Sequence, residues 1–390
     1  MNESDALLLL SICAGAFLMP FICKRISIPS AVGEIFFGLG AGFFFKEAYH
    51  RATIIKYLGE LGFMLLMYLA GLEIDFEKIK ITPPKQLILY IAMIVSIIIF
   101  SIGAAYVYRM PPIYALIFLT TAIGLLFPVL KETGLIKKDI GQKLLIIGGI
   151  GEMFSLLGLT VFILYYRSGF SLESLLHLGE IGAFIVLAYI IYKLFRLVMW
   201  WFPGLVRPFL HTDDPMESGI RANFVNMFVF VALAALLHIE LIIGAFLGGI
   251  AFAVIFKKRA EIQHRIGSFA YGFLIPVFFI EVGLRFEIKD LVNIQVLVMA
   301  CVITFIIFAV RIMASLILLF SNLTLREIIL VPVSTSFSLT LLVAIAAFGL
   351  EQHIIPRDQA ASILSAALLT AFVYPAILKK IIKSSEHPQP

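Results

Sequence analysis

The chain has 390 residues, of which 61% are hydrophobic and 14% charged, and its mean hydropathy is +1.04. Soluble domains average about 25% charged residues, so this composition excludes an ordinary soluble domain and indicates a polytopic protein of the lipid bilayer. The formal net charge of +5 follows membrane topology rather than a basic binding face, and we therefore expect no nucleic-acid partner.

Thirteen apolar stretches are long enough to cross a membrane as helices, since about 20 apolar residues span the hydrocarbon core. In chain order they are 6–22, 29–45, 57–73, 87–107, 112–130, 141–165, 176–201, 218–237, 240–256, 266–284, 292–320, 328–350 and 360–378. The first stretch lacks a basic segment before it and a clear cleavage site, which favours a span over a signal peptide. These features predict an all-α polytopic membrane fold.

Basic residues are distributed unevenly over the segments between these spans. If the N-terminus is outside, 21 of the 30 Lys and Arg residues fall in cytoplasmic segments, 8 fall in outer segments, and Arg311 lies within a span. Cytoplasmic loops of membrane proteins are enriched in Lys and Arg. The asymmetry predicts an outer N-terminus and a cytoplasmic C-terminus.

Two pairs of similar segments lie 211 or 212 residues apart, and each pair joins spans that are seven helices apart. They are VGEIFFGLGAG (32–42) with IGAFLGGIAFA (243–253), and YLAGLEIDF (68–76) with IEVGLRFEI (280–288). An odd displacement makes the two copies run through the membrane in opposite directions, an arrangement common in transporters. We predict an inverted-topology repeat, with repeat one at about 6–165, a linker helix at about 176–201 and repeat two at about 218–380.

Two spans in matching positions of these repeats, the fifth and the twelfth, carry residues that interrupt helices. The fifth contains Thr120, Thr121, Gly124 and Pro128, and the twelfth contains Pro332 with the hydroxyl cluster Ser334, Thr335, Ser336, Ser338 and Thr340. Proline removes a backbone hydrogen bond, and a broken helix offers carbonyl and hydroxyl oxygens to a small alkali cation. A single hydroxyl is better explained by bonds to its own or a neighbouring helix, but two clusters in matching spans predict an ion site.

The segment GGIGEMFSLLG (148–158) places Glu152 inside an apolar run. A charge near the bilayer centre costs at least about 2.5–3.5 kcal/mol, so an intramembrane acid is a candidate for function. With a rise of about 1.5 Å per residue, Glu152 and Arg311 lie about 16 Å and about 14 Å from the inner ends of their helices. We expect these two charges to pair at this shared depth and to separate when a cation enters.

The expected ion-binding residues are Glu152, Thr120, Thr121, Ser155, Ser334, Ser336 and Arg311, with Glu152 as the ligand of the monovalent cation. Glu34 and Glu281 are the candidates for an ion vestibule. Glu281 precedes Arg285 by four residues, which favours an exposed ion pair over a role in the ion path. Glu34 fits a vestibule, a packing role or a helix cap. Asn223 and Asn226 share one helix face, a pattern that favours bridges between helices.

Five motifs occur in one order along the chain: IPSAVGEIFFGLGAG, LGELGFMLLMYLAGLEID, FPVLKETGLIKKDIGQ, IPVFFIEVGLRFEI and ALLTAFVYPAI. Together they resemble the sodium (or potassium)/proton exchanger domain of the monovalent cation/proton antiporter-2 family, over about 6–380. The resemblance implies a homodimer with 13 helices per chain, in which a core domain with crossed broken helices moves against a dimerisation domain. It also implies the inner (plasma) membrane of a bacterium.

The same resemblance implies that Thr120 and Thr121 mark the first broken helix, that Glu152 takes the place of an ion-binding aspartate, and that Arg311 matches the basic residue opposite it. The chain departs from the family at Gly151–Glu152, where the family typically has Asn-Asp, Asp-Asp or Gln-Asp. Related potassium efflux systems carry a nucleotide-binding regulatory domain after the membrane part, and we expect no such C-terminal domain within residues 1–390.

These features predict a secondary antiporter rather than an enzyme. A single acid that binds either a proton or a cation couples the two fluxes, because the two ligands exclude each other. Arg311 keeps its own proton. We therefore expect alternating access with electroneutral exchange of one proton per Na⁺, K⁺ or Li⁺, without a cofactor, in the service of pH homeostasis.

Two alternatives stay open. One is a potassium efflux pathway without proton exchange, and the other is a degenerate antiporter-like scaffold or sensor, which the Gly151–Glu152 departure would explain. No GxxxxGK motif is present to drive transport with ATP. The sequence does not select among the cations, because selectivity depends on cavity size and ligand field.

Overall fold

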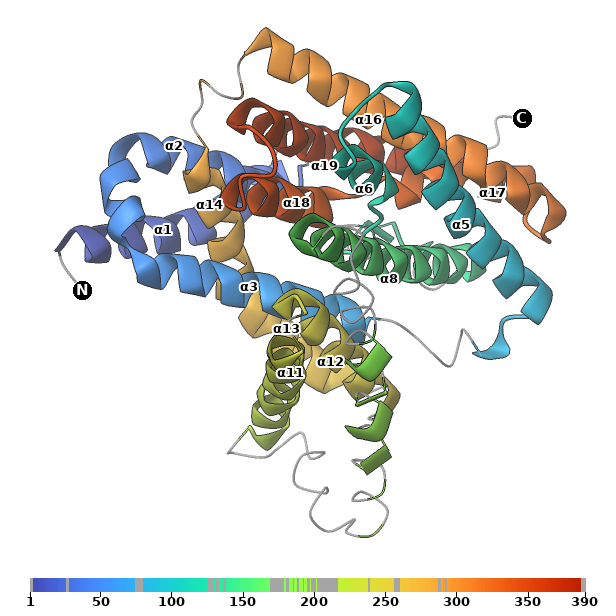
Figure 1. Ribbon diagram of the computed structural model, residues 1–390, viewed down its shortest axis with the longest axis horizontal. Helices are drawn as coiled ribbons and strands as arrows, with labels where there is room; N and C mark the ends of the chain where they lie inside the picture. The colour runs from blue at the N-terminus through green and yellow to red at the C-terminus, as the bar shows by residue number, and fades with distance from the viewer. Residues whose placement is uncertain are drawn as a thin grey trace. The chain divides into compact units, whose positions relative to one another are not determined.

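The computed structural model describes residues 3–25, 28–73, 80–124, 126, 129–130, 133–135, 138–168, 179, 182–184, 186–187, 189–191, 193–194, 197, 201, 217–237, 239–255, 260–286, 289, 291 and 293–386. These residues form helices and connecting turns, with no strand among them (Figure 1). The all-α prediction is therefore confirmed. Pro128, one of the residues expected to interrupt the fifth span, and half of the predicted linker helix at 176–201 lie outside the described residues. The number of 13 spans therefore stays a prediction.

The helices of the first half are α1 (Glu3–Arg25), α2 (Ser30–Arg51), α3 (Thr53–Leu72), α5 (Pro84–Val107), α6 (Ile113–Leu119) and α8 (Asp139–Ser168). Those of the second half are α11 (Ser218–Leu236), α12 (Leu241–Ile255), α13 (Ala260–Phe269), α14 (Ile275–Arg285), α16 (Ile294–Ser315), α17 (Leu325–Thr335), α18 (Leu339–Glu351) and α19 (Arg357–Glu386). A π-helical turn, Ala270–Leu274, joins α13 to α14, and a 3₁₀ turn, Leu316–Phe320, follows α16.

Nine helices of the described part of the chain are long and apolar enough to cross a membrane, and Ser30–Phe45 and Leu241–Val254 are shorter apolar helices. Local signals set several of their ends. α2 and α5 begin directly after Pro29 and Pro83, respectively. α17 begins with a capping box, in which Thr324 and Glu327 satisfy each other's backbone N–H groups.

The chain divides into two compact units, one formed by 1–53, 77–159 and 279–390 and the other by 54–76 and 160–278. In the first unit, α16 packs against α5, α6 and α19, and α18 packs against α19 (Figure 1). This group of helices contains both predicted broken spans, and the candidate site lies within it.

In each unit, the described residues include a crossing of two helices at which a glycine of one helix faces a glycine of the other. In the first unit, a Cβ atom at Gly38 of α2 would overlap the carbonyl oxygen of Ile280, and one at Gly283 of α14 would overlap that of Ile35. Only glycine allows the backbones to approach this closely.

In the second unit, Gly71 of α3 and Gly249 of α12 make the same kind of crossing, against the carbonyl oxygens of Phe246 and Tyr68, respectively. All four glycines belong to the segments that recur 211 or 212 residues apart, and the carbonyl partners recur at the same separations.

A buried polar network joins three helices of the second unit. The Tyr68 hydroxyl donates to Asn223 Oδ1 over 2.7 Å, and Asn226 Nδ2 donates to the Tyr68 oxygen and to the carbonyl of Gly248 over 3.2 and 2.8 Å. The prediction that Asn223 and Asn226 bridge helices is confirmed. A fully satisfied network of this kind fixes the register of α11 against α3 and α12.

Candidate ion-binding site

The first broken span is interrupted where its sequence predicted. α6 ends at Leu119, and the following five residues, 120–124, are not helical. The Thr120 hydroxyl donates to the carbonyl of Ile117, and the backbone N–H of Thr121 donates to Ser155 Oγ of α8 over 2.9 Å. Backbone groups freed by the break are thus bonded by side chains instead of by the helix.

The second break separates α17 from α18 at residues 336–338, four residues beyond Pro332. The expectation that Pro332 itself helps to interrupt the helix is wrong, because this residue lies inside α17. Two hydroxyls donate to backbone carbonyls near the end of α17: Ser334 donates to the carbonyl of Val331 over 2.9 Å, and Ser336 donates to that of Pro332 over 2.7 Å. Such side-chain bonds compete with the helical ladder.

One hydroxyl joins the two breaks. Ser338 Oγ, fully buried between α17 and α18, donates to the carbonyl of Thr120 over 2.5 Å. The sequence placed Ser338 in the hydroxyl cluster but did not select it as a site residue. Ser338 could have been selected only if the position of the break, directly before Leu339, had been known.

Glu152 lies in α8 beside the first break and is fully buried. Its Oε2 accepts the backbone N–H of Ile123 over 3.2 Å, and its Oε1 has no hydrogen-bond partner. Ser155, one turn later, accepts from Thr121 and donates to the carbonyl of Gly151 over 2.8 Å. The site therefore contains one carboxylate oxygen with its bonding capacity unused.

Arg311 of α16 is also fully buried, and its guanidinium donates to the backbone carbonyls of four residues. Nε donates to Thr335 over 2.9 Å, Nη1 donates to Phe118 and Ile307 over 3.0 and 2.8 Å, and Nη2 donates to Thr120. Phe118 lies in the last turn of α6, Thr120 directly follows that helix, and Thr335 is the last residue of α17. Arg311 thus caps the negative ends of both broken helices.

The predicted ion pair between Arg311 and Glu152 is wrong, because no ion pair joins these two residues in the described structure. Equal depth in the membrane did not bring them together. The planar guanidinium has five donors in a fixed fork, and the carbonyls at two helix ends offer more bonds to it than one carboxylate does.

The two vestibule candidates take other positions. Glu281 pairs with Arg285 over 2.8 Å, as the i,i+4 spacing predicted, and also accepts from the Tyr49 hydroxyl. This carboxylate is only 1% exposed, so the pair is buried and not the surface pair expected; Arg285 also reaches Glu351 over 3.1 Å. Glu34 is buried in α2. Neither acid bonds to a residue of the two breaks.

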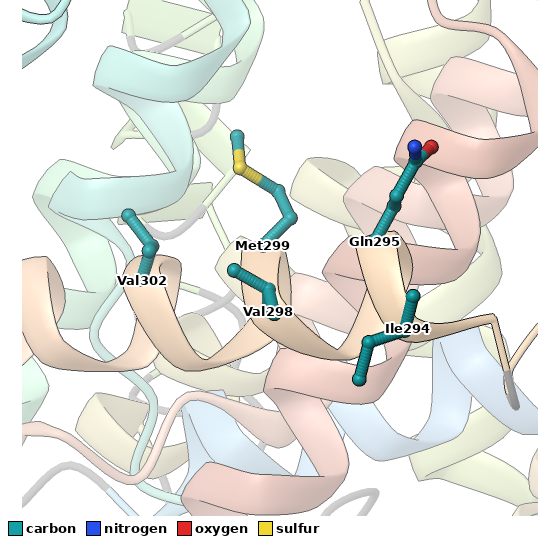
Figure 2. A pocket seen from close by; sticks show the side chains of 5 residues that line it. All are labelled: Ile294, Gln295, Val298, Met299 and Val302. Carbon is teal, nitrogen blue, oxygen red and sulfur yellow. The ribbon is translucent and has the colours of Figure 1, made fainter.

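A separate apolar groove lies along mostly exposed residues of α16 (Figure 2). It measures about 310 Å³ and is lined by Ile294, Gln295, Val298, Met299 and Val302. None of these five side chains is charged, so the groove is not a candidate for the ion site.

Comparison with known proteins places the chain in a family. The model described as "Sodium/hydrogen exchanger, transmembrane" matches residues 13–384. The chain belongs to the sodium/hydrogen exchanger family. With its apolar helices, this membership makes the chain an integral, multi-pass membrane protein.

Among the relatives of this chain is YjbQ of Bacillus subtilis, named as a candidate Na⁺/H⁺ antiporter. It is 28% identical over an alignment of 404 positions, which covers 96% of this chain and 62% of YjbQ. The Na⁺/H⁺ antiporter of Enterococcus hirae is 23% identical, with 93% and 94% of the two chains covered. The solved sodium/proton antiporter MjNhaP1 of Methanocaldococcus jannaschii is 16% identical, with a TM-score of 0.68 over 98% of this chain and 96% of that chain, and so shares its fold.

The departure of this chain from the family pattern at Gly151 has a packing reason. A Cβ atom at Gly151 would lie 2.9 Å from Cγ2 of Thr121, closer than real Cβ contacts come. Thr121 therefore fills the space beside the carboxylate where, by the family resemblance, a polar side chain would stand. The glycine lets α8 approach the first break closely enough for Ser155 to bond Thr121.

Proposed function

We propose that the chain is a secondary antiporter that exchanges a monovalent cation for protons, with Glu152 as the shared carrier. The observation that carries this proposal is the state of its carboxylate, which is fully buried at the break of a span and leaves Oε1 without a hydrogen bond. A buried acid of this kind gains most from binding a proton or a cation. Because both ligands need the same oxygens, they exclude each other.

The stoichiometry follows from the role of Arg311. Its guanidinium is bonded to helix-end carbonyls and keeps its proton at all ordinary pH values. Glu152 is then the one group of the site that changes charge, and it carries either one proton or one monovalent cation. We infer an electroneutral, one-to-one exchange by alternating access.

Features of the chain also support the architecture of an antiporter, with two inverted repeats and a defined orientation in the membrane. The two glycine crossings correspond at the separations of 211 and 212 residues, and they support a pair of inverted repeats at about 6–165 and 218–380. The loop charges support an outer N-terminus and a cytoplasmic C-terminus. The homodimer and the bacterial inner membrane rest on the family resemblance. The relative GerN of Bacillus cereus, named as a Na⁺/H⁺-K⁺ antiporter, supports testing K⁺ beside Na⁺.

The test is proton movement in proteoliposomes, followed with a pH-sensitive dye while Na⁺, Li⁺ or K⁺ is added. The intact protein should move protons with at least one cation, and Glu152→Gln should not. Glu152→Asp keeps the carboxylate and should retain part of the exchange. Glu47→Gln, which alters an exposed acid of α2, is the matched control and should behave as the intact protein.

Electroneutrality is tested in the same vesicles by imposing a membrane potential during Na⁺-driven exchange. A one-to-one exchange moves no net charge, so its rate should not change with the potential. A rate that scales with the potential would refute the stoichiometry. Cation flux without proton movement would favour the efflux pathway, and no flux of either kind would favour a scaffold or sensor.

A further inference from the structure

Thr340, the second residue of α18, is a buried hydroxyl whose bonding capacity is unused. Its side chain is 2% exposed, and Oγ1 has no hydrogen-bond partner. The other four members of the hydroxyl cluster, Ser334, Thr335, Ser336 and Ser338, all donate to carbonyls. A buried hydroxyl without a partner is unfavourable, and such exceptions in native proteins call for an explanation.

The position of this hydroxyl relates it to Glu152. A Cβ atom at Gly124 would lie 3.4 Å from Thr340 Cγ2 and 3.9 Å from Oγ1, so the threonine packs directly on the first break. Ile123, the preceding residue, donates its N–H to Glu152 Oε2. The hydroxyl and the carboxylate thus border two consecutive residues of the break. Each contributes one buried oxygen without a partner.

We propose that the Thr340 hydroxyl is a further oxygen ligand of the monovalent cation carried by Glu152 and that it sets the preference among cations. The proposal rests on the proposed function and adds a specificity-determining residue to it. Alkali cations bind hard oxygen ligands, and the number and spacing of those ligands decide which cation fits. Because the hydroxyl is neutral, it changes cation affinity without changing the charge that is exchanged.

The experiment compares three variants of the full chain. Thr340→Val removes the hydroxyl at nearly constant volume, and Thr340→Ser restores it. Thr370→Val is the matched control, because Thr370 is equally buried but its hydroxyl donates to Ala367 of its own helix. Cation binding is measured in detergent as the rise of the melting temperature with Na⁺, Li⁺ or K⁺, at constant ionic strength set with choline. The apparent KM and the maximal rate are measured in proteoliposomes.

We expect Thr340→Val to weaken binding and raise the KM of the preferred cation on the order of tenfold, the loss of about one ligand bond. Its maximal rate and its electroneutrality should be unchanged. Thr340→Ser should regain most of the affinity, and Thr370→Val should match the intact protein. A merely structural role would lower the melting temperature without cation and leave the KM unchanged.

The failures of the two proposals are distinguishable. If Glu152→Gln abolishes exchange but Thr340→Val keeps the affinity of the intact protein for every cation, only the role of Thr340 is overturned. If no cation stabilises the intact protein, the ligand role is overturned without any transport assay.

Should Thr340→Val not fold, Gly124→Ala tests the same position, because its added methyl group would contact Thr340 and fill the space beside the hydroxyl. It should weaken the binding of K⁺ more than that of Li⁺. Unchanged affinities for both cations would overturn the proposal.

Discussion

Arg311 donates a hydrogen bond to the carbonyl oxygen of Thr120, the residue that follows the last turn of α6. The same guanidinium reaches the carbonyl of Thr335 at the end of α17, 24 residues further along its own half of the chain. The positive charge of the guanidinium therefore lies at the negative ends of two helix dipoles. The carboxylate of Glu152 is left free of an ion pair for its proposed ligands.

The first prediction concerns Arg311. Arg311→Gln should destabilise the protein by at least about 3 kcal/mol, because several buried carbonyls lose their donors and each costs about 1–3 kcal/mol. Arg311→Lys keeps the charge but loses the fork of donors, and its effect should be intermediate. Thermal unfolding in detergent measures both. Arg221→Gln, at an exposed position of α11, serves as control and should leave the melting temperature nearly unchanged.

The glycine crossing of the first unit gives the second prediction. Gly38→Ala places a methyl group on the carbonyl oxygen of Ile280 and should destabilise the protein severely or prevent its folding. In the same helix, Gly40→Ala meets nothing within 4 Å and should stabilise α2 by up to about 1 kcal/mol through helix propensity. Yield and melting temperature of the two variants are compared. Equal behaviour of the pair would contradict the close approach of α2 and α14.

The third prediction separates the two partners of Arg285. Arg285→Leu leaves the buried carboxylate of Glu281 without its cation and should cost about 3–5 kcal/mol. Glu351→Gln removes the other ion pair, whose carboxylate side chain is 59% exposed, and should cost at most about 1 kcal/mol. The melting temperatures should therefore fall much further for Arg285→Leu. Similar losses in the two variants would refute the burial assigned to Glu281.

Ser155 gives the fourth prediction. Ser155→Ala leaves the backbone N–H of Thr121 buried without an acceptor, at a cost of about 1–3 kcal/mol. The first break should also lose its fixed position beside Glu152, so exchange in proteoliposomes should slow. Ser362→Ala is the matched control in α19, since its buried hydroxyl donates to Asp358 of its own helix. A slower exchange in both variants would argue against a specific role for Ser155.

Local features of the sequence were sufficient for much of the fold. Hydropathy identified the membrane helices, because burial in lipid demands long apolar runs. Thr120, Thr121 and Gly124 identified the first break, and the spacing of Glu281 and Arg285 identified their ion pair. The glycine segments marked positions where helices later proved to cross. Each of these signals depends on residues close together in the chain.

The candidate site could be predicted only in part. Glu152 was found because an acid in an apolar run has few structural explanations. The partner of Arg311 was predicted wrongly, since depth along a helix does not determine which way a side chain turns or what it meets. Ser338 and Thr340 could not be told apart from their hydroxyl neighbours by sequence. The structure separates the two residues. Ser338 donates to the carbonyl of Thr120, 218 positions away in the chain, whereas the hydroxyl of Thr340 has no hydrogen-bond partner.

The sequence by itself determined that this protein lies in the membrane, which two spans contain breaks, and that Glu152 lies deep within a span. The tertiary structure decided which groups those breaks bring together: Arg311 with the carbonyls of Thr120 and Thr335, Ser155 with Thr121, and Glu152 with one free oxygen. The physical reason is the separation in sequence over which each effect acts. Hydropathy and helix breaking act along the chain, whereas a buried polar group takes whichever partner the packing of distant helices presents.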